Sequence, residues 1–268
     1  MAGLDGPRAK LWRADAQLMK LREEVEGRWP RAKLWPVRVE PDGSGLKYDF
    51  YVVQEGLPEI RPEWGPWAGE VMFDLRCALD HLAFQLWMRR FRGVMNAEIE
   101  TISQFPIYDK PDAFVNFRNR LTKVCEKQGV PTLTERDWRA LCHLQPYITR
   151  HDKWYWDRNW LRDLNELHRF DKHRKLHVIT GAQNSAVVYQ FDPALGYRSN
   201  TTWGPLKPDG HVETWTFTQV PPEVPPHRGV FLQVSLEYGV AWAELAVMLQ
   251  GMRAAVDRVL NRFADRFP

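Results

Sequence analysis

The chain has 268 residues, which is enough for one large domain or two small ones with a substantial core. Hydrophobic residues at 44% and charged residues at 26% are ordinary for a soluble globular protein. The net charge of +3, from 37 basic and 34 acidic residues, does not by itself indicate a nucleic-acid-binding protein.

The cysteines and the hydropathy pattern indicate the compartment. Cys77, Cys125 and Cys142 are an odd number without CxxC spacing, which argues against disulfides and against a thiolate zinc site. The N-terminus carries no apolar signal core, and the chain contains no run of about 18 apolar residues. We therefore expect a soluble, cytoplasmic protein with no membrane partner.

The first part of the chain predicts a helix and then a hairpin. The helix covers residues 8–27, with apolar residues at three- and four-residue steps: Leu11, Ala14, Leu18, Leu21 and Val25. Trp-Pro pairs at 29–30 and 35–36 end it. Residues 37–40 and 46–53 then alternate around a glycine-containing turn, which indicates a β-hairpin.

A long central helix is predicted over residues 66–92. Its apolar stripe keeps the same spacing: Met72, Leu75, Leu79, Leu82 and Leu86. Beside this stripe lie four chargeable residues, Asp74, Arg76, Asp80 and His81. They are the first group of candidate functional residues.

Further helices are predicted at 111–127 and 134–144, which together with their connection span 111–144, and at 156–176. Thr134 with Asp137 is a capping signal for the second of them, and Pro146 ends it. The segment 177–237 is β-rich, with strands expected at 177–180, 186–191, 213–219 and 230–237.

A last helix is predicted over residues 240–263, again with a three–four apolar seam. The long N-terminal, central and C-terminal helices are natural partners in a bundle. We predict a single α+β domain, residues 1–268, in which a helical bundle receives an antiparallel sheet before its last helix.

Arg76 and His81 form an Arg-x4-His pair on the central helix. Residues five apart lie about 140° apart around a helix, so the two side chains do not touch directly. They can converge on a ligand at a helix end or across a dimer interface. Alternatively, Arg76 pairs with Asp80 at i,i+4, and His81 is a half-buried, hydrogen-bonded histidine.

A second polar group, Asp171-Lys172-His173-Arg174, follows later, and we predict that it shares one site with the first. His173 and His177 are four apart, the spacing with which two imidazoles can bind one metal. The third ligand would be His81, Asp80 or Asp171. Because the chain has neither HExxH nor a cysteine pair, we expect no cofactor, with a divalent metal as the alternative.

Residues 147–177 combine basic and aromatic side chains. They hold eight Lys or Arg residues against five acidic ones, interleaved with Trp154, Tyr155, Trp156 and Trp160. Basic groups for phosphates and rings for base stacking are what a single-stranded nucleic-acid site needs. A solvated helix whose tryptophans fill the core explains the same composition.

Four sequence blocks resemble those of a widespread family of uncharacterised bacterial proteins. The family's blocks LRSALDHLA, FPI, LQPY and L-N-x-L-x-N-x-DKHR correspond here to residues 75–83, 105–107, 144–147 and 164–174. The resemblance covers about residues 65–180. The sequence departs from the pattern at Cys77, where the family has Ser, and at His168-Arg169, where it has Asp-Asn. The resemblance implies no activity.

The stretch Arg76-Cys-Ala-Leu-Asp-His81 also resembles the Arg-x4–6-His signature of the HEPN superfamily of all-helical ribonucleases and RNA-binding domains. That resemblance implies a homodimer and a metal-independent RNA cleavage. His81 would act as general base or acid for attack by the 2′-hydroxyl, and Arg76 would stabilise charge on the phosphorane, beside Asp80. The predicted substrate-binding residues are Asp171, Lys172, His173, Arg174, Trp156 and Trp160.

Three functions stay open on the sequence. The first is the HEPN-like RNA endonuclease, a toxin or phage-defence effector. The second is a small-molecule enzyme or sensor, in which Asp80, His81, Asp171 and His173 line a Trp-rich pocket, with or without a metal. The third is a non-catalytic structural or interaction protein whose charged groups are buried ion pairs that hold helices together.

Overall fold

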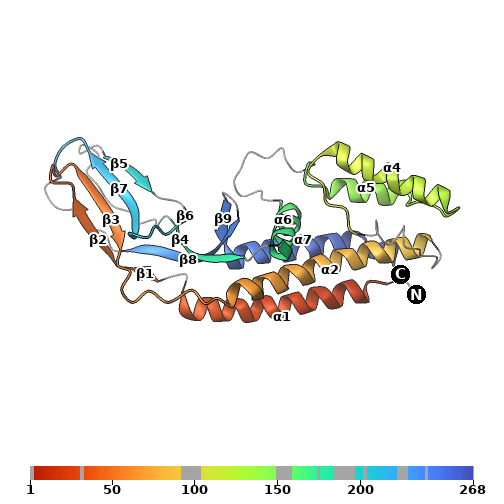
Figure 1. The fold of residues 1–268 in the computed structure, drawn as a ribbon, viewed down its shortest axis with the longest axis horizontal. Coiled ribbons are helices and arrows are strands. Elements are labelled where there is room, and N and C mark those ends of the chain that lie inside the picture. Colours follow the sequence, from red (N-terminus) through yellow and green to blue (C-terminus); the bar gives the residue numbers. More distant parts are fainter. Residues whose placement is uncertain are drawn as a thin grey trace. The chain divides into compact units, whose positions relative to one another are not determined.

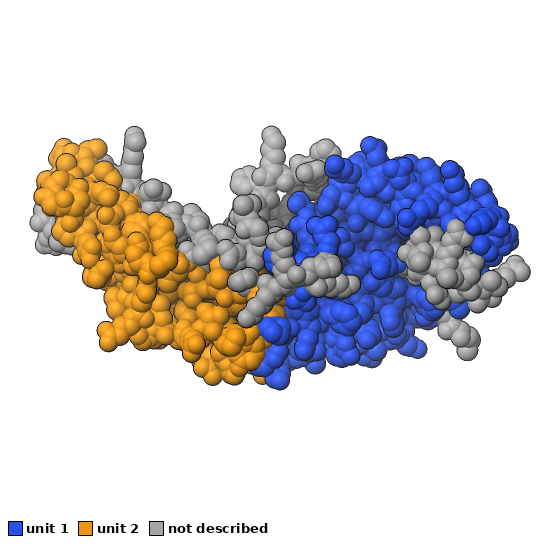
Figure 2. Space-filling model, in the orientation of Figure 1, with its two compact units in different colours: residues 1–20, 66–175, 246–268 blue, residues 21–65, 176–245 orange. Residues whose placement is uncertain are grey.

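The computed structural model describes residues 3–30, 33–91, 104–148, 159–173, 176–183, 197–201, 204–221, 229–238 and 241–267. The chain divides into two compact units, coloured separately in Figure 2. Unit 1 contains residues 1–20, 66–175 and 246–268, and unit 2 contains residues 21–65 and 176–245. Neither unit is one continuous piece of chain. The prediction of a single domain stays a prediction.

Unit 1 is helical. Its elements are α1 (Asp5–Arg28, up to residue 20), α2 (Trp64–Arg90, from residue 66), α4 (Pro111–Lys127), α5 (Glu135–His143), α6 (Trp160–His173), α7 (Leu245–Arg262, from residue 246) and the short 3-10 helix η2 (Ala264–Arg266). The long helices α1, α2 and α7 lie side by side (Figure 1). Arg13 of α1 pairs with Asp74 of α2, and Asp15 of α1 pairs with Arg253 of α7. The predicted partnership of these three helices is therefore confirmed.

Helix α2 is the core of unit 1. All five residues of its predicted apolar stripe are at most 3% exposed. Small and aromatic residues beside the stripe are buried as well: Ala78, Ala83 and Trp87. A helix that is apolar on most sides is surrounded by other elements. This explains why Asp74 and Arg76 are buried although they lie off the stripe.

Helices α4 and α5 pack through an aromatic cluster centred on Trp138. Pro111 begins α4 at the first helical position, where its missing N–H is not needed. The backbone N–H of Asp137 donates to Thr134 Oγ1 at 3.2 Å, so the predicted cap of α5 is confirmed. The Trp138 ring lies 6.4 Å from that of Trp87 on α2 and 6.1 Å from that of Phe114 on α4.

Gly251 of α7 allows the close approach of α6. A β-carbon there would lie 2.7 Å from Cζ2 of Trp160 and closer still to Cε2 and Cδ2. The indole therefore lies directly against the α7 backbone, and no larger residue fits without movement of a packed ring. Trp160 contributes to the packing of unit 1, which is the structural alternative to its predicted role in substrate binding.

We expect Gly251→Ala to lower the free energy of unfolding by about 1–3 kcal/mol, because overpacking displaces a rigid ring and a helix. Gly27→Ala on α1 is the matched control, since a β-carbon there meets nothing within 4 Å. Alanine at that helical position should raise the free energy of unfolding by about 0.5–1 kcal/mol. Urea denaturation followed by circular dichroism measures both changes. Equal effects of the two substitutions would contradict the α6–α7 contact.

Unit 2 contains two antiparallel sheets. In one, the strand order is β1 (Leu34–Trp35), β8 (Val230–Tyr238), β4 (His177–Gln183) and β6 (Gly204–Pro205), and β9 (Ala241–Glu244) also pairs with β8. In the other, the order is β2 (Val37–Pro41), β3 (Lys47–Val52), β7 (His211–Phe217) and β5 (Tyr197–Thr201). The predicted hairpin corresponds to β2 and β3, and Phe50 packs on Trp215 with ring centroids 4.5 Å apart.

The fold class is confirmed as α+β, with antiparallel sheets before the last helix. The last helix begins at Leu245, five residues later than predicted, because Ala241–Glu244 pairs with β8 as a strand instead. The predicted strand at 186–191 lies outside the described residues. Within the described part of the chain, no helix is both long and apolar enough to cross a membrane.

Candidate functional site

Arg76 is buried, with 6% of its surface exposed, and all three guanidinium nitrogens have partners inside unit 1. Nε donates to Asp80 at 3.2 Å, and Nη1 donates to the side-chain oxygen of Asn165 on α6 at 3.1 Å. Nη2 donates to the carbonyl of Phe105 at 2.9 Å and lies 2.9 Å from the second Asp80 oxygen. The i,i+4 pair between Arg76 and Asp80 that the sequence offered as one alternative is present.

Asp80 completes this arrangement from the same helix. Its Oδ1 accepts the backbone N–H of Phe105 at 2.9 Å. Arg76 and Asp80 therefore bind both polar groups of the Phe105 backbone, which would otherwise be unpaired next to a side chain that is 1% exposed. Two charged residues on α2 fix an extended segment that has no strand partner of its own.

Gln145 binds the same segment from the other side. Its Nε2 donates to the carbonyl of Pro106 at 3.0 Å, and its Oε1 accepts the backbone N–H of Tyr108 at 2.9 Å. Gln145 follows the end of α5, is fully buried and also donates to the carbonyl of Leu141 in that helix. All four sequence blocks thus meet in one hydrogen-bond network, through Arg76, Phe105, Gln145 and Asn165, which we call the framework.

The fourth block, residues 164–174, lies mostly on α6, which packs antiparallel against α2. From one end to the other, the contacts are Gly69 with Asp171, Phe73 with His168, and Arg76 with Asn165. A β-carbon at Gly69 would lie 2.7 Å from the Asp171 carboxylate. Arg76 of the first predicted polar group and Asp171 of the second therefore lie on one helix–helix interface, and about 10 Å of helix axis separates Gly69 from Arg76.

Partial burial raises the pKa of the Asp171 carboxyl above its usual value. The side chains of Lys172 and His173 and the whole of Arg174 and Trp156 lie outside what the structure describes. Their predicted roles stay predictions.

His81 lies on a different side of α2 from Arg76. It is exposed rather than half-buried. Its ring lies close to Gly6 of α1, since a β-carbon added at Gly6 would be 3.3 Å from His81 Nδ1. Among the described residues, His81 has no hydrogen-bond or ion-pair partner. The structure therefore brings Arg76 together with Asp80 but does not bring His81 to either of them within the subunit.

Metal binding finds no support among the described residues. In that part of the chain, no group of three or more His, Cys, Asp or Glu side chains lies close enough together to hold a metal ion. The alternative ligand set of His81, His173 and His177 includes two histidines whose side chains fall outside the description. That alternative stays a prediction.

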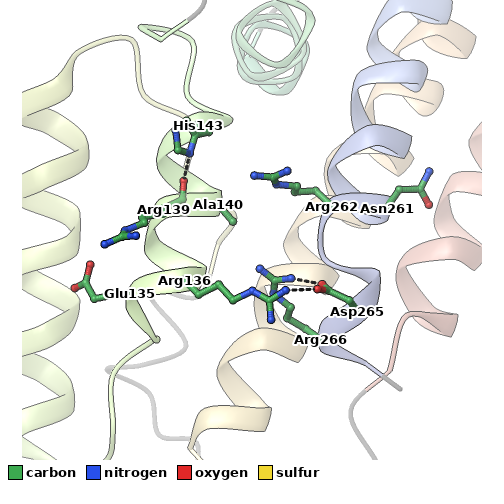
Figure 3. A pocket seen from close by; sticks show the side chains of 9 residues that line it. All are labelled: Glu135, Arg136, Arg139, Ala140, His143, Asn261, Arg262, Asp265 and Arg266. Carbon is green, nitrogen blue, oxygen red and sulfur yellow. Dashed lines mark hydrogen bonds and ion pairs between the residues drawn. The ribbon is translucent and has the colours of Figure 1, made fainter.

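A cavity of about 650 Å³ lies between α5 and the C-terminal end of α7 in unit 1 (Figure 3). Its lining is polar and rich in arginine: Glu135, Arg136, Arg139, Ala140, His143, Asn261, Arg262, Asp265 and Arg266. A second cavity of about 260 Å³ shares three of these residues and adds Arg89 and Arg90 from the end of α2. We call the two adjoining cavities the arginine cleft.

Sequence reasoning did not identify the arginine cleft. Arg136 and Arg139 look like ordinary exposed residues of an amphipathic helix, as do Arg262 and Arg266 at the end of the chain. A usable signal was the three-residue step from Arg136 to Arg139, which places both arginines on one face of α5. The sequence contained no sign that this face meets the C-terminal end of α7.

Comparisons of the chain with protein-family models, with curated proteins and with solved structures find no match.

Proposed function

We propose that the protein acts by binding a partner rather than by catalysis, and that the Arg76 network is its structural framework. The observation that supports this proposal is the state of Arg76. Each guanidinium nitrogen is already hydrogen-bonded inside unit 1, and the side chain is 6% exposed. An arginine that stabilises a phosphorane must instead present free N–H groups to the reacting phosphate.

The framework explains why the four sequence blocks occur together without assigning them chemistry. Arg76 and Asp80 bind the Phe105 backbone, Gln145 binds the next residues, and Asn165 connects α6. Each contact satisfies a polar group that folding would otherwise bury unpaired, which costs about 1–3 kcal/mol per group. We therefore assign these residues a role in stabilising the fold and not in catalysis.

The RNA endonuclease is the competing function, because His81 is exposed and can reach a ligand. The test is incubation of total RNA with the purified protein in the presence of a chelator, beside His81→Ala purified in parallel. We expect no cleavage that depends on His81. A contaminating nuclease would cleave equally in both preparations, so equal cleavage also fits the proposal. Cleavage by the wild-type protein that His81→Ala abolishes would overturn it.

A further inference from the structure

The arginine cleft concentrates positive charge. Its two cavities are lined by six arginines against three carboxylates, a formal charge of +3. The entire chain of 268 residues has the same net charge. A concave surface with a net charge focuses the electrostatic potential and raises the local concentration of oppositely charged ligands. Anionic ligands are therefore the class that this surface attracts.

The carboxylates in the cleft already have cationic partners. Asp265 pairs with both Arg136 and Arg266, and the bond from Arg266 lowers the pKa of the Asp265 carboxyl. Asp137 also accepts from Arg266, at 3.3 Å. Glu135 pairs with Arg118, which lies outside the cleft. No acid of the lining remains to neutralise the other arginines.

The guanidinium groups of Arg139 and Arg262 have no ion-pair or hydrogen-bond partner among the described residues, although the Arg139 carbonyl bonds to His143 Nδ1. Figure 3 shows the side chain of Arg262 extending from α7 toward α5, while that of Arg136 extends from α5 toward α7. The Arg136 side chain is 71% exposed, so its pair with Asp265 is a weak surface pair that a better anion can replace. Two guanidinium groups thus face the cavity from opposite walls.

We propose that the arginine cleft binds clustered phosphate groups. Guanidinium groups bind phosphate oxygens bidentately, and two or more adjacent phosphates offset the charge of the cleft. Apart from Ala140 and Leu86, the lining residues are polar or charged, and none carries an aromatic ring other than the His143 imidazole. Pockets for drug-sized ligands are mostly apolar, so the cleft fits the phosphates of a ligand rather than its base or another apolar part. Two sources supply such phosphates: a nucleic-acid strand and a compact polyphosphate.

The proposal is independent of the framework, since Arg76 lines neither cavity. The decisive variant is Arg136→Gln with Arg262→Gln, which removes the two facing guanidinium groups from exposed positions. The matched control is Arg120→Gln with Arg8→Gln, which removes the same charge from exposed residues of unit 1 that line neither cavity. Circular dichroism and urea denaturation confirm that both double variants fold.

The measurement is fluorescence anisotropy of a short labelled single-stranded oligonucleotide titrated with the full chain at low salt. We expect saturable binding that Arg136→Gln/Arg262→Gln weakens about tenfold or more and that the control weakens less than about twofold. The slope of log affinity against log salt should fall by about two in the cleft variant, one for each lost phosphate contact.

Competition with inorganic triphosphate separates the two sources. Displacement of the oligonucleotide by micromolar triphosphate identifies a compact polyphosphate as the ligand. Binding of the oligonucleotide that triphosphate leaves unchanged identifies a nucleic-acid strand. Absence of saturable binding by either probe would overturn the proposal, as would equal weakening by the cleft variant and the control.

Discussion

Arg76→Leu is expected to lower the free energy of unfolding by about 3 kcal/mol, the lower end of the range for removing one partner of a buried ion pair. The substitution leaves Asp80, the Phe105 carbonyl and the Asn165 side chain without their donor. The Asp80 side chain is 32% exposed, so water recovers part of its loss, which is why we choose the lower end. Urea denaturation followed by circular dichroism measures the change.

Arg22→Leu is the control for the removal of a helical arginine. Arg22 forms an i,i+4 pair with Glu26 on α1, and the side chain is 44% exposed. Exposed pairs of this kind contribute about 0.3–0.5 kcal/mol, so the change in the free energy of unfolding should be small. If Arg76→Leu had an effect as small as Arg22→Leu, the framework would not stabilise the fold.

Arg76→Lys tests whether the shape of the guanidinium matters or only its charge. A lysine ammonium can pair with Asp80, but it is a point charge and cannot reach Asn165 and the Phe105 carbonyl at the same time. We expect a loss of about 1–2 kcal/mol, between the wild type and Arg76→Leu. A loss as large as that of Arg76→Leu would show that the charge of the side chain adds nothing.

The contact of the framework between residues close in sequence could be predicted. The contacts between residues far apart in sequence could not. Arg76 and Asp80 are four residues apart on a helix, so their pairing follows from helical geometry. The partners Phe105 and Asn165 are 29 and 89 residues away from Arg76. Their approach depends on how helices and loops pack, which no spacing along one helix reveals.

The same limit explains why the arginine cleft was missed. The ion pair that closes it joins Arg136 to Asp265 across 129 residues. On α5 and on the short helix η2 separately, Arg136 and Asp265 are indistinguishable from other charged surface residues. In contrast, the α2 stripe and the bundle partnership of α1, α2 and α7 were predictable, because apolar periodicity is a local signal that burial enforces.

The framework and the arginine cleft contain different charged residues of unit 1. Arg76 and Asp80 are satisfied by the protein itself, so their charge is not available to a ligand. Arg262 lies at the surface without a described partner, so its charge is available. We therefore expect substitutions in the arginine cleft to weaken ligand binding and substitutions in the framework to lower the free energy of unfolding.

Trp138→Ala is expected to lower the free energy of unfolding by about 3–5 kcal/mol, because it removes a large side chain that is 2% exposed and leaves a cavity. Trp138 is the contact through which α5 packs on Trp87 of α2 and on Phe114 and Phe117 of α4. Trp12→Ala is the control, since that indole is 66% exposed and its loss should change stability by less than about 0.5 kcal/mol.

Trp138 also supports the α5 wall that carries Arg136 and Arg139. Trp138→Phe keeps an aromatic ring and should cost about 1–2 kcal/mol, so it remains folded under conditions where the alanine variant unfolds. Because this substitution removes no charge, any weakening of phosphate binding in the folded variant reports on how rigidly α5 holds its arginines. We expect a two- to fivefold loss of oligonucleotide affinity with an unchanged salt slope, since rigid support preserves the geometry of a site while its charges set the salt dependence. Unchanged affinity would mean that the arginines act as mobile charges, whose binding does not depend on the packing beneath them.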